Sequence, residues 1–351
     1  MNISLSQIAL PQISVIIPIY NGEADLPDLL CCLEQQTYPT AQVEYLLIDN
    51  NSRDRTLALL QTLCPVSPLA ATIRCLRESQ IQSAYAARNT GIRAAQGKIL
   101  VFTDADCRPQ PDWLLHLVQP FTESQVGLVA GEVTGLPGNS ILERYAVRQA
   151  TLSQKHTLAH DFLPYGQTAN LAVRRQIFEQ VGLFRPYLTT GGDADLCWRA
   201  LQSGCEIRMA EQALVQHRHR ATLAELRSQW QRYGRSNHYL HILHGINLTK
   251  ALSCQDTLRR WSRWFLKEVP LAVMQVFIES KEKGAGLSRL IDAMVETPLN
   301  LICQQARSQG QRQAQLPDAA REIVWLDQAK LGAENRSNQK SGHSSESLNC
   351  P

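Results

Sequence analysis

The chain has 351 residues and a formal net charge of +3. Its composition, with 44% hydrophobic and 19% charged residues, is that of a globular protein, and its length allows one large α/β domain with an appendage, or two domains. A net charge this small gives no support by itself for nucleic-acid binding. No run reaches about 18 consecutive apolar residues, so we expect no helix that spans a bilayer.

The N-terminus and the cysteines indicate where the protein works. Residues 1–12 contain no basic residue and no secretory apolar core, which argues against a signal peptide. The ten cysteines form no Cys-x-x-Cys pair and no zinc-type spacing, and we interpret them as small buried side chains in a reducing compartment. We therefore expect a cytoplasmic protein, with contact to the inner face of the cell membrane left open.

Strands and helices alternate in the first part of the chain. Short apolar runs predict buried strands at residues 13–19, 43–49 and 99–102, and residues 72–77 predict a weaker strand. The segments between them have apolar or small residues at helical spacing. This alternation predicts βαβ units and a parallel sheet, in which ligands bind at the carboxyl ends of the strands.

The order changes after residue 125. We expect a strand at 126–133, a polar helix at 140–159, a short strand at 168–173, helices at 174–181 and 191–199, one or two strands within 205–216, and helices from 222 onward. We divide the chain into an N-terminal extension (1–12), an α/β domain (13–220) with two halves (13–125 and 126–220), a helical C-terminal region (221–331) and a polar tail expected to be disordered (332–351).

The triplet Asp104-Ala105-Asp106 directly follows the predicted strand at 99–102. Two carboxylates this close repel each other, and burial makes both harder to ionise. A divalent cation such as Mg²⁺ or Mn²⁺ relieves the conflict, because it binds carboxylate oxygens and keeps positions free for phosphate oxygens. The triplet therefore suggests a metal that holds a nucleotide diphosphate; an ordinary turn is the alternative.

Five segments, in this order, resemble the family 2 glycosyltransferases, which are inverting enzymes of the GT-A fold. They are Val15–Asn21, Leu46–Ser52 with Asp54 and Thr56, Ala87–Gly91, Phe102–Asp106 and Gly192–Arg199. The resemblance covers about residues 12–240. It implies that residues 13–220 are the catalytic domain, with a nucleotide-binding half (13–125) and an acceptor half (126–220). It implies a Rossmann-like, mostly parallel sheet flanked by helices, to which the C-terminal helices are appended. It also implies a hexosyltransferase-like enzyme that uses a UDP- or GDP-linked sugar and a hydroxyl acceptor on a glycan, a lipid-linked sugar or a small molecule.

The resemblance also implies roles around the donor phosphates. Asp106 would coordinate the metal that bridges them, and Asp104 would touch the ribose or the water shell of the metal. His217 would complete the metal shell, the alternative being an ordinary core or surface histidine. Asp49 would accept hydrogen bonds from the base or ribose, unless it only caps a turn.

The other predicted donor-site residues are Pro18, Tyr20, Asn21, Arg88, Asn89 and Asn170. The turn from Pro18 to Asn21 would pass the nucleobase, with Tyr20 either stacked on it or packed in the loop. Arg88 offers a planar cationic fork for a pyrophosphate, or it pairs with an acidic loop and holds its shape. Asn170 either lines the sugar pocket or has a capping role.

Asp193 is the predicted general base, because the family places its base in an acidic pair just before a Leu-x-x-Arg helix. Gly192 departs from this pattern, since the first position of the pair is more commonly glutamate. Asp195 is the rival: it lies at the helix start and is either the base or a carboxylate stabilised by the helix dipole. A modest upward shift of its pKa would suit the base.

Basic residues are concentrated in the segment 217–267, which has ten Lys or Arg against two acidic residues. Trp261, Trp264 and Phe265 lie among them, and the apolar run 269–278 follows. This pattern fits a helix on an anionic membrane surface; the alternative is a helical appendage with a solvated basic face. A nucleic-acid partner is not expected, because no stacking platform or reader motif occurs.

Two other functions compete with sugar transfer. A nucleotidyltransferase would have a Gly-rich loop with Lys or Arg after the first strand, which residues 18–22 lack. A catalytically inactive nucleotide-sugar-binding protein would have lost a metal or base carboxylate, and both are retained.

Overall fold

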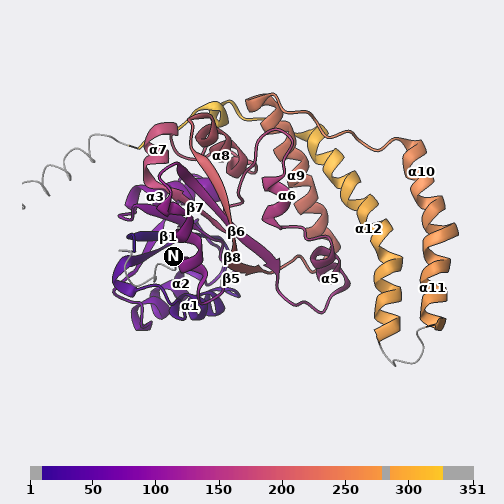
Figure 1. Cartoon of the computed structure of the whole chain (residues 1–351), viewed down its shortest axis with the longest axis horizontal. Helices are drawn as coiled ribbons and strands as arrows, with labels where there is room; N and C mark the ends of the chain where they lie inside the picture. The colour runs from indigo at the N-terminus through magenta and orange to yellow at the C-terminus, as the bar shows by residue number, and fades with distance from the viewer. Residues whose placement is uncertain (1–9, 279–284, 327–351) are drawn as a thin grey trace, which may run out of the picture.

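The computed structural model describes residues 10–278 and 285–326, without the side chains of 275–289. Most of the predicted N-terminal extension and the whole predicted tail lie outside these residues. The described chain contains one sheet, in the order β3-β2-β1-β4-β7-β6-β8-β5 (Figure 1). The strands are β1 (Ile13–Ile19), β2 (Val43–Asp49), β3 (Ile73–Arg77), β4 (Ile99–Phe102), β5 (Cys107–Pro109), β6 (Val126–Gly135), β7 (Leu171–Arg174) and β8 (Glu206–His217).

The first four strands in space are all parallel, as the alternating pattern predicts. Every residue of β1 is buried, because helices cover both faces of the sheet. Ile13, Val15 and Ile17 pack on one face with α1 (Leu26–Glu34) and α4 (Trp113–Val118). Ile16 packs on the other face with α3 (Ala84–Ala94), α7 (Arg175–Val181) and α8 (Gly192–Gln202). α2 (Thr56–Leu63) connects β2 to β3.

The second half of the sheet is mixed. β7 is antiparallel to both β4 and β6, whereas β8 is parallel to β6 and carries a register shift. The predicted helix at 140–159 is wrong: it is two helices, α5 (Ile141–Arg148) and α6 (Gln154–Leu158), separated at Ala150, which has a φ of 46°. β5 was not predicted, because three residues are too few to show a periodic pattern.

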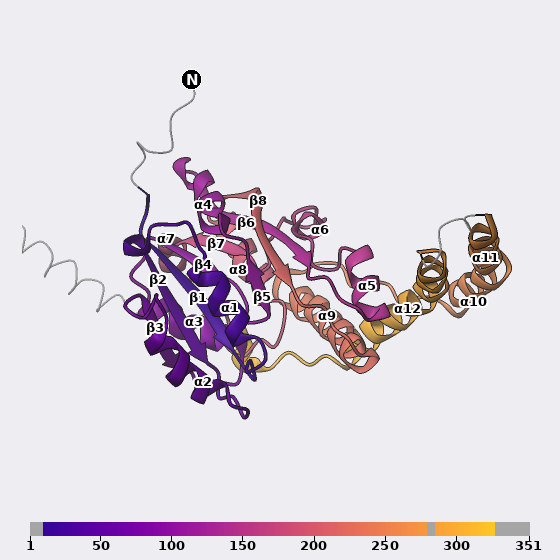
Figure 2. The ribbon, with the colours of Figure 1, turned by 90° about the horizontal axis from the view of Figure 1, so that it is seen from below.

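The C-terminal helices extend away from the sheet. α9 (Leu223–His244) packs beside α12 (Ala285–Gln313), and α10 (Cys254–Arg263) and α11 (Val269–Ile278) lie on the far side of α12 (Figures 1 and 2). Among the described helices, none combines the length and the apolar character needed to cross a bilayer.

After α12 the chain returns to the α/β domain. The Leu183 amide donates to the Val324 carbonyl at 2.7 Å, and Ala320 is fully buried in the core between the sheet and α8. The region from 221 onward therefore shares a core with the first domain. The cysteine interpretation is wrong at three positions, since Cys31, Cys75 and Cys254 are exposed.

Candidate active site

Two overlapping cavities open where β1 and β4 end. The first has a volume of ≈ 520 Å³, and the second, of ≈ 470 Å³, continues from it toward α8. Their lining contains eight of the twelve predicted site residues: Pro18, Tyr20, Asn21, Arg88, Asp104, Asp106, Asp193 and His217. Side chains that the sequence places far apart thus face one space.

Asp104 lies opposite a buried cation at the cavity wall. Its carboxylate accepts a hydrogen bond from Arg88 Nη2 at 2.5 Å. Arg88 projects from α3 and is nearly fully buried, and its guanidinium lies 5.5 Å from the centre of the Tyr85 ring. Arg88 Nε has no hydrogen-bond partner within the described structure. The guanidinium is therefore held in place, at the cavity, with donor capacity to spare.

Asp106 is held beside His217 by strand pairing. Cys107, the first residue of β5, lies opposite His217 at the end of β8. His217 Nε2 is 3.3 Å and Arg220 Nη2 is 3.6 Å from Asp106 Oδ2. Burial opposes ionisation of Asp106, but the charges of His217 and Arg220 outweigh it and hold its pKa well below the usual range.

Asp193 lies in the first turn of α8, which Gly191 enters with a φ of 82°. Thr168 Oγ1 donates a hydrogen bond to Asp193 Oδ1 at 3.0 Å. Burial raises the pKa of Asp193, Arg88 opposes this shift and Asp104 adds to it. The carboxylate therefore has a raised pKa and faces the cavity.

Tyr85 explains why residue 192 is glycine. Its hydroxyl accepts a hydrogen bond from the Gly192 amide at 2.9 Å. A Cβ at this position would come within 2.7 Å of the Tyr85 ring. The space that an acidic side chain would need is thus filled by the ring of Tyr85.

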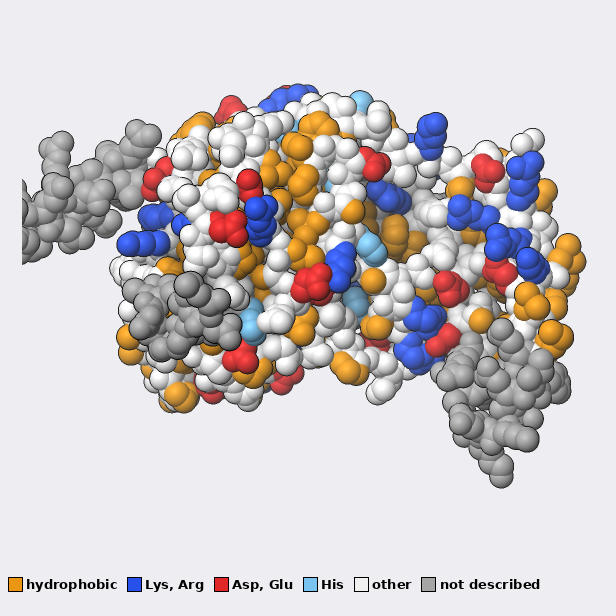
Figure 3. Space-filling view, viewed as in Figure 1, with side chains coloured by type: hydrophobic (Ala, Val, Ile, Leu, Met, Phe, Trp, Pro, Cys, Tyr) orange, Lys and Arg blue, Asp and Glu red, His pale blue; other side chains and the backbone are white. Residues whose placement is uncertain are grey.

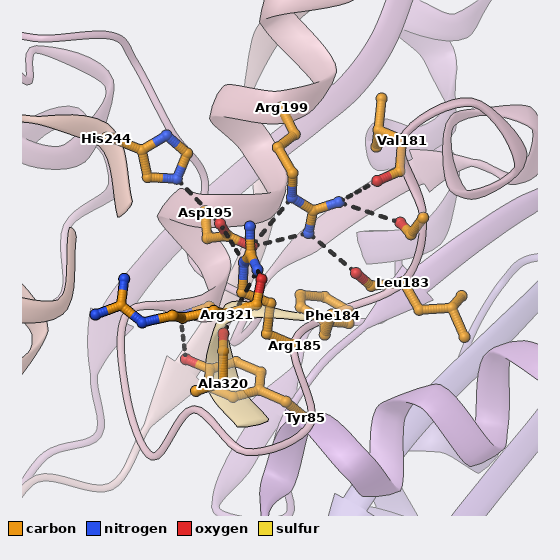
Figure 4. Close-up of polar contacts among 12 residues, drawn as sticks. Tyr85, Val181, Leu183, Phe184, Arg185, Asp195, Arg199, His244, Ala320 and Arg321 are labelled. Atoms are coloured by element: carbon orange, nitrogen blue, oxygen red, sulfur yellow. Dashed lines mark hydrogen bonds and ion pairs between the residues drawn. The ribbon is translucent and has the colours of Figure 1, made fainter. Parts of the chain in front are cut away.

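Asp195 lies in a closed ionic cluster (Figure 4). It is 0% exposed, and its oxygens contact Arg185 Nε at 3.0 Å, Arg199 Nη2 at 2.8 Å and His244 Nε2 at 3.0 Å. Burial opposes its ionisation, but the hydrogen bond from His244 and the two arginines lower its pKa. With both oxygens paired and no exposure, this carboxylate joins α8 to α9 and to the chain before α8.

Three other predicted site residues are buried outside these cavities. Asn89 exchanges hydrogen bonds with the Phe184 backbone at 2.8 and 3.1 Å. Asn170 Oδ1 accepts a hydrogen bond from Trp113 Nε1 at 2.7 Å, and its Nδ2 donates to two backbone carbonyls. Both polar atoms of the side-chain amide therefore have partners within the protein. Asp49 accepts from the Ser52 amide at 3.2 Å, and its Oδ2 has no hydrogen-bond partner in the described structure.

The sequence interpretation did not assign four further lining residues to the site. Arg220 and Arg232 were counted only as part of the basic segment, and Tyr85 and Thr168 were not singled out. The available signal was the position of the two arginines, directly after the last strand and on the helix that follows. Their side chains make the cavity wall opposite Asp104 and Asp106 cationic.

The chemistry of the two carboxylates fits a hard divalent cation. Within the described residues, no three Asp, Glu, His or Cys side chains are grouped closely enough to hold a metal. Asp104 and Asp106 would therefore supply part of a coordination shell, and phosphate oxygens and waters the rest, which is how Mg²⁺ usually binds.

Comparisons with known proteins agree with this geometry. The sequence model described as "Glycosyl transferase family 2" matches residues 14–182, and that described as "Glycosyl transferase family group 2" matches residues 99–280. The chain is 33% identical over 246 residues to "Glycosyltransferase AglE" of Haloferax volcanii, which covers 70% of this chain and 79% of that protein.

Two further relatives match over a smaller share of their length. "Pre-mycofactocin glycosyltransferase" of Mycobacterium tuberculosis is 28% identical over 71% of this chain and 52% of that protein. "Undecaprenyl-phosphate 4-deoxy-4-formamido-L-arabinose transferase" of Pseudomonas aeruginosa is 28% identical over 56% of this chain and 57% of that protein. The chain therefore spans little more than half the length of these two relatives.

A solved structure shares the fold. The mannosyltransferase PcManGT from Pyrobaculum calidifontis, in complex with GDP-Man and Mn²⁺, has a TM-score of 0.51 and 17% sequence identity. The match covers 95% of this chain and 81% of that one.

Proposed function

The chain belongs to glycosyl transferase family 2, and from this premise we propose that it is an inverting enzyme which uses a UDP- or GDP-linked sugar. The observation that carries the proposal is that Asp104, Asp106, Arg88 and Asp193 all line the two overlapping cavities. Charge stabilisation for a leaving diphosphate and a base for an acceptor hydroxyl are thus available at one place.

The donor would occupy the larger cavity. Tyr20 is exposed at its rim, where a nucleobase can stack on the ring. Arg88, Arg220 and Arg232 face the same space and provide charged donors for the two phosphates. A Mn²⁺ or Mg²⁺ ion on Asp106 and Asp104 would act as a Lewis acid for the departing diphosphate. His217 would orient Asp106 through the contact at Nε2.

Asp193 would act on the acceptor. Its raised pKa makes it a better proton acceptor than an ordinary aspartate. The acceptor oxygen attacks the anomeric carbon, the bond to the diphosphate breaks on the opposite face, and the hydroxyl proton passes to Asp193. Thr168 holds the carboxylate in position for this step through its hydrogen bond.

A donor assay tests the proposal. We expect one sugar of a UDP- and GDP-linked panel to be hydrolysed slowly without acceptor, with nucleotide diphosphate release falling at least about tenfold when EDTA replaces Mn²⁺. Transfer from an α-linked donor should give a β-linked product, and NMR of the product determines its anomeric configuration. Release of inorganic pyrophosphate from a nucleoside triphosphate and a sugar phosphate would instead indicate a nucleotidyltransferase. Failure of every nucleotide sugar to bind would contradict the proposal.

We also propose that α10, α11 and the short helical segment that joins them, Trp264–Glu268, contact an anionic bilayer. Apolar side chains are exposed in this joining segment, among them Phe265 (69% exposed) and Leu266 (73%), next to the exposed Arg259, Arg263 and Lys267. Figure 3 shows basic and apolar side chains together at this end of the molecule, away from the sheet. Apolar insertion and attraction to anionic lipids would act together on this surface.

Vesicle sedimentation tests the membrane contact. Replacing Phe265 and Leu266 together by serine should weaken binding to phosphatidylglycerol-containing vesicles by at least about tenfold, because each buried side chain contributes about 1.5–3 kcal/mol. Val66→Ser is the matched control, since Val66 is 78% exposed in the α/β domain, before β3. Equal binding of all three proteins would show that this surface does not contact lipid.

A further inference from the structure

A further cavity, of ≈ 300 Å³, lies beyond Asp193. It shares Tyr85, Thr190, Asp193 and Tyr233 with the ≈ 470 Å³ cavity, which overlaps the larger cavity assigned to the donor. Its remaining wall includes the aromatic side chains of His160, Tyr165 and Trp230, together with Arg307. An acceptor held there would lie next to Asp193.

Arg307 is a cation without a carboxylate partner in the described chain. No Asp or Glu is among the described groups whose charge acts on Arg307, and Arg307 Nε is buried without a hydrogen-bond partner. Burial lowers the pKa of Arg307, with Tyr165 and Tyr233 nearby opposing that shift. A guanidinium that is partly buried and lacks an anion is costly, so this position favours an anionic ligand.

The cationic lining continues outward from Arg307. Another cavity, of ≈ 320 Å³, shares Trp230 and Arg307 with the ≈ 300 Å³ cavity and adds Lys250 and Arg260. Among the described residues, no carboxylate lines the ≈ 320 Å³ cavity, and Asp193 is the one carboxylate that lines the ≈ 300 Å³ cavity. Positive charge therefore extends from the neighbourhood of the base toward α10.

Close helix packing fixes Arg307 over the cavity. A Cβ on Gly234 of α9 would collide with the Arg307 carbonyl, and a Cβ on Gly310 of α12 would collide with the Gln231 backbone. The backbones of α9 and α12 are therefore in direct contact next to Arg307, through Gly234 on α9 and Gly310 on α12. Residue 307 lies beyond both segments that the family sequence models match, 14–182 and 99–280.

We infer that the acceptor is a sugar bearing a phosphate ester, whose phosphate pairs with Arg307 while a sugar hydroxyl faces Asp193. This inference rests on the proposed glycosyl transfer. The tyrosine and tryptophan rings offer flat apolar faces to the sugar, and the guanidinium fork matches a phosphate. A second phosphate, or the diphosphate of a lipid-linked sugar, would extend toward Lys250 and Arg260.

The test compares acceptors that differ only in the phosphate. The full chain, with the donor found in the hydrolysis assay, is given hexose 1-phosphates, their methyl glycosides, and the same hexoses on farnesyl diphosphate. We expect KM for a phosphorylated form to be about 10- to 100-fold below that of its methyl glycoside, as for a charge-assisted contact. Preference for the farnesyl form indicates a lipid-linked acceptor, and preference for the hexose 1-phosphate a soluble one.

Arg307→Gln should remove this preference, and Arg307→Lys should restore part of it. Lys250→Gln should weaken binding of the diphosphate form alone. Because Lys250 is exposed, this variant also provides a test if the Arg307 variants do not fold. Arg312→Gln is the control, since it removes an exposed charge from the same helix. Wild-type protein that hydrolyses its donor but treats phosphorylated and methylated acceptors alike would overturn this inference. Wild-type protein without donor hydrolysis would instead count against the proposed function.

Discussion

Asp193→Asn is expected to lower kcat for sugar transfer by about 10³-fold, within the range that a positioned general base contributes. The asparagine can still accept the hydrogen bond from Thr168, so the local structure should persist. Donor binding, measured by calorimetry with the nucleotide sugar, should change little, because the metal proposed to hold the phosphates is assigned to Asp104 and Asp106 and not to Asp193. Full activity of Asp193→Asn would show that another group takes the proton.

Asp195→Asn tests whether Asp193, and not Asp195, is the general base. Removing one charge from the cluster with Arg185, Arg199 and His244 leaves buried cations uncompensated, which costs about 3–5 kcal/mol of folding free energy. We expect a lower melting temperature for this variant, whereas Asp193→Asn should melt close to wild type. Normal stability with lost turnover for Asp195→Asn would reverse the two assignments.

The acidic side of the pH profile should report Asp193. The base must be ionised, and its pKa is raised, so kcat/KM should fall as pH drops through a value above the ordinary aspartate pKa of about 3.9. The residual activity of Asp193→Asn should lack this fall.

Asp106→Asn is expected to lower transfer by about 10³-fold and to abolish the response to Mn²⁺, since Lewis-acid stabilisation contributes several kcal/mol and each 1.36 kcal/mol is tenfold in rate. The variant keeps the size of the side chain and loses the charge that pairs with His217 and Arg220. Manganese binding by calorimetry, in the presence of UDP or GDP, provides a readout independent of turnover.

Asp112→Asn is the matched control for that variant. Asp112 is an exposed carboxylate before α4, and its removal changes the net charge equally without touching the cavities. Manganese dependence retained in Asp106→Asn and unchanged in Asp112→Asn would place the metal elsewhere.

The sequence by itself determined the parallel half of the sheet and the positions of Asp104, Asp106 and Asp193 in chain order. Runs that are almost entirely apolar, such as residues 13–19, have one stable environment, a strand covered on both faces, and the local pattern is enough to identify it. The segments that resemble family 2 glycosyltransferases then gave the family.

Only the tertiary structure decided which of these groups share a space. Asp106 and His217 come together through the β5–β8 pairing, Asp195 is enclosed by residues from α9 and the chain before α8, and Arg307 reaches the ≈ 300 Å³ cavity from α12. Each contact joins residues from ten to more than a hundred positions apart, for which a single sequence contains no local signal. Two aspartates two positions apart, Asp193 and Asp195, thus point into different environments, because successive positions on a helix face different directions.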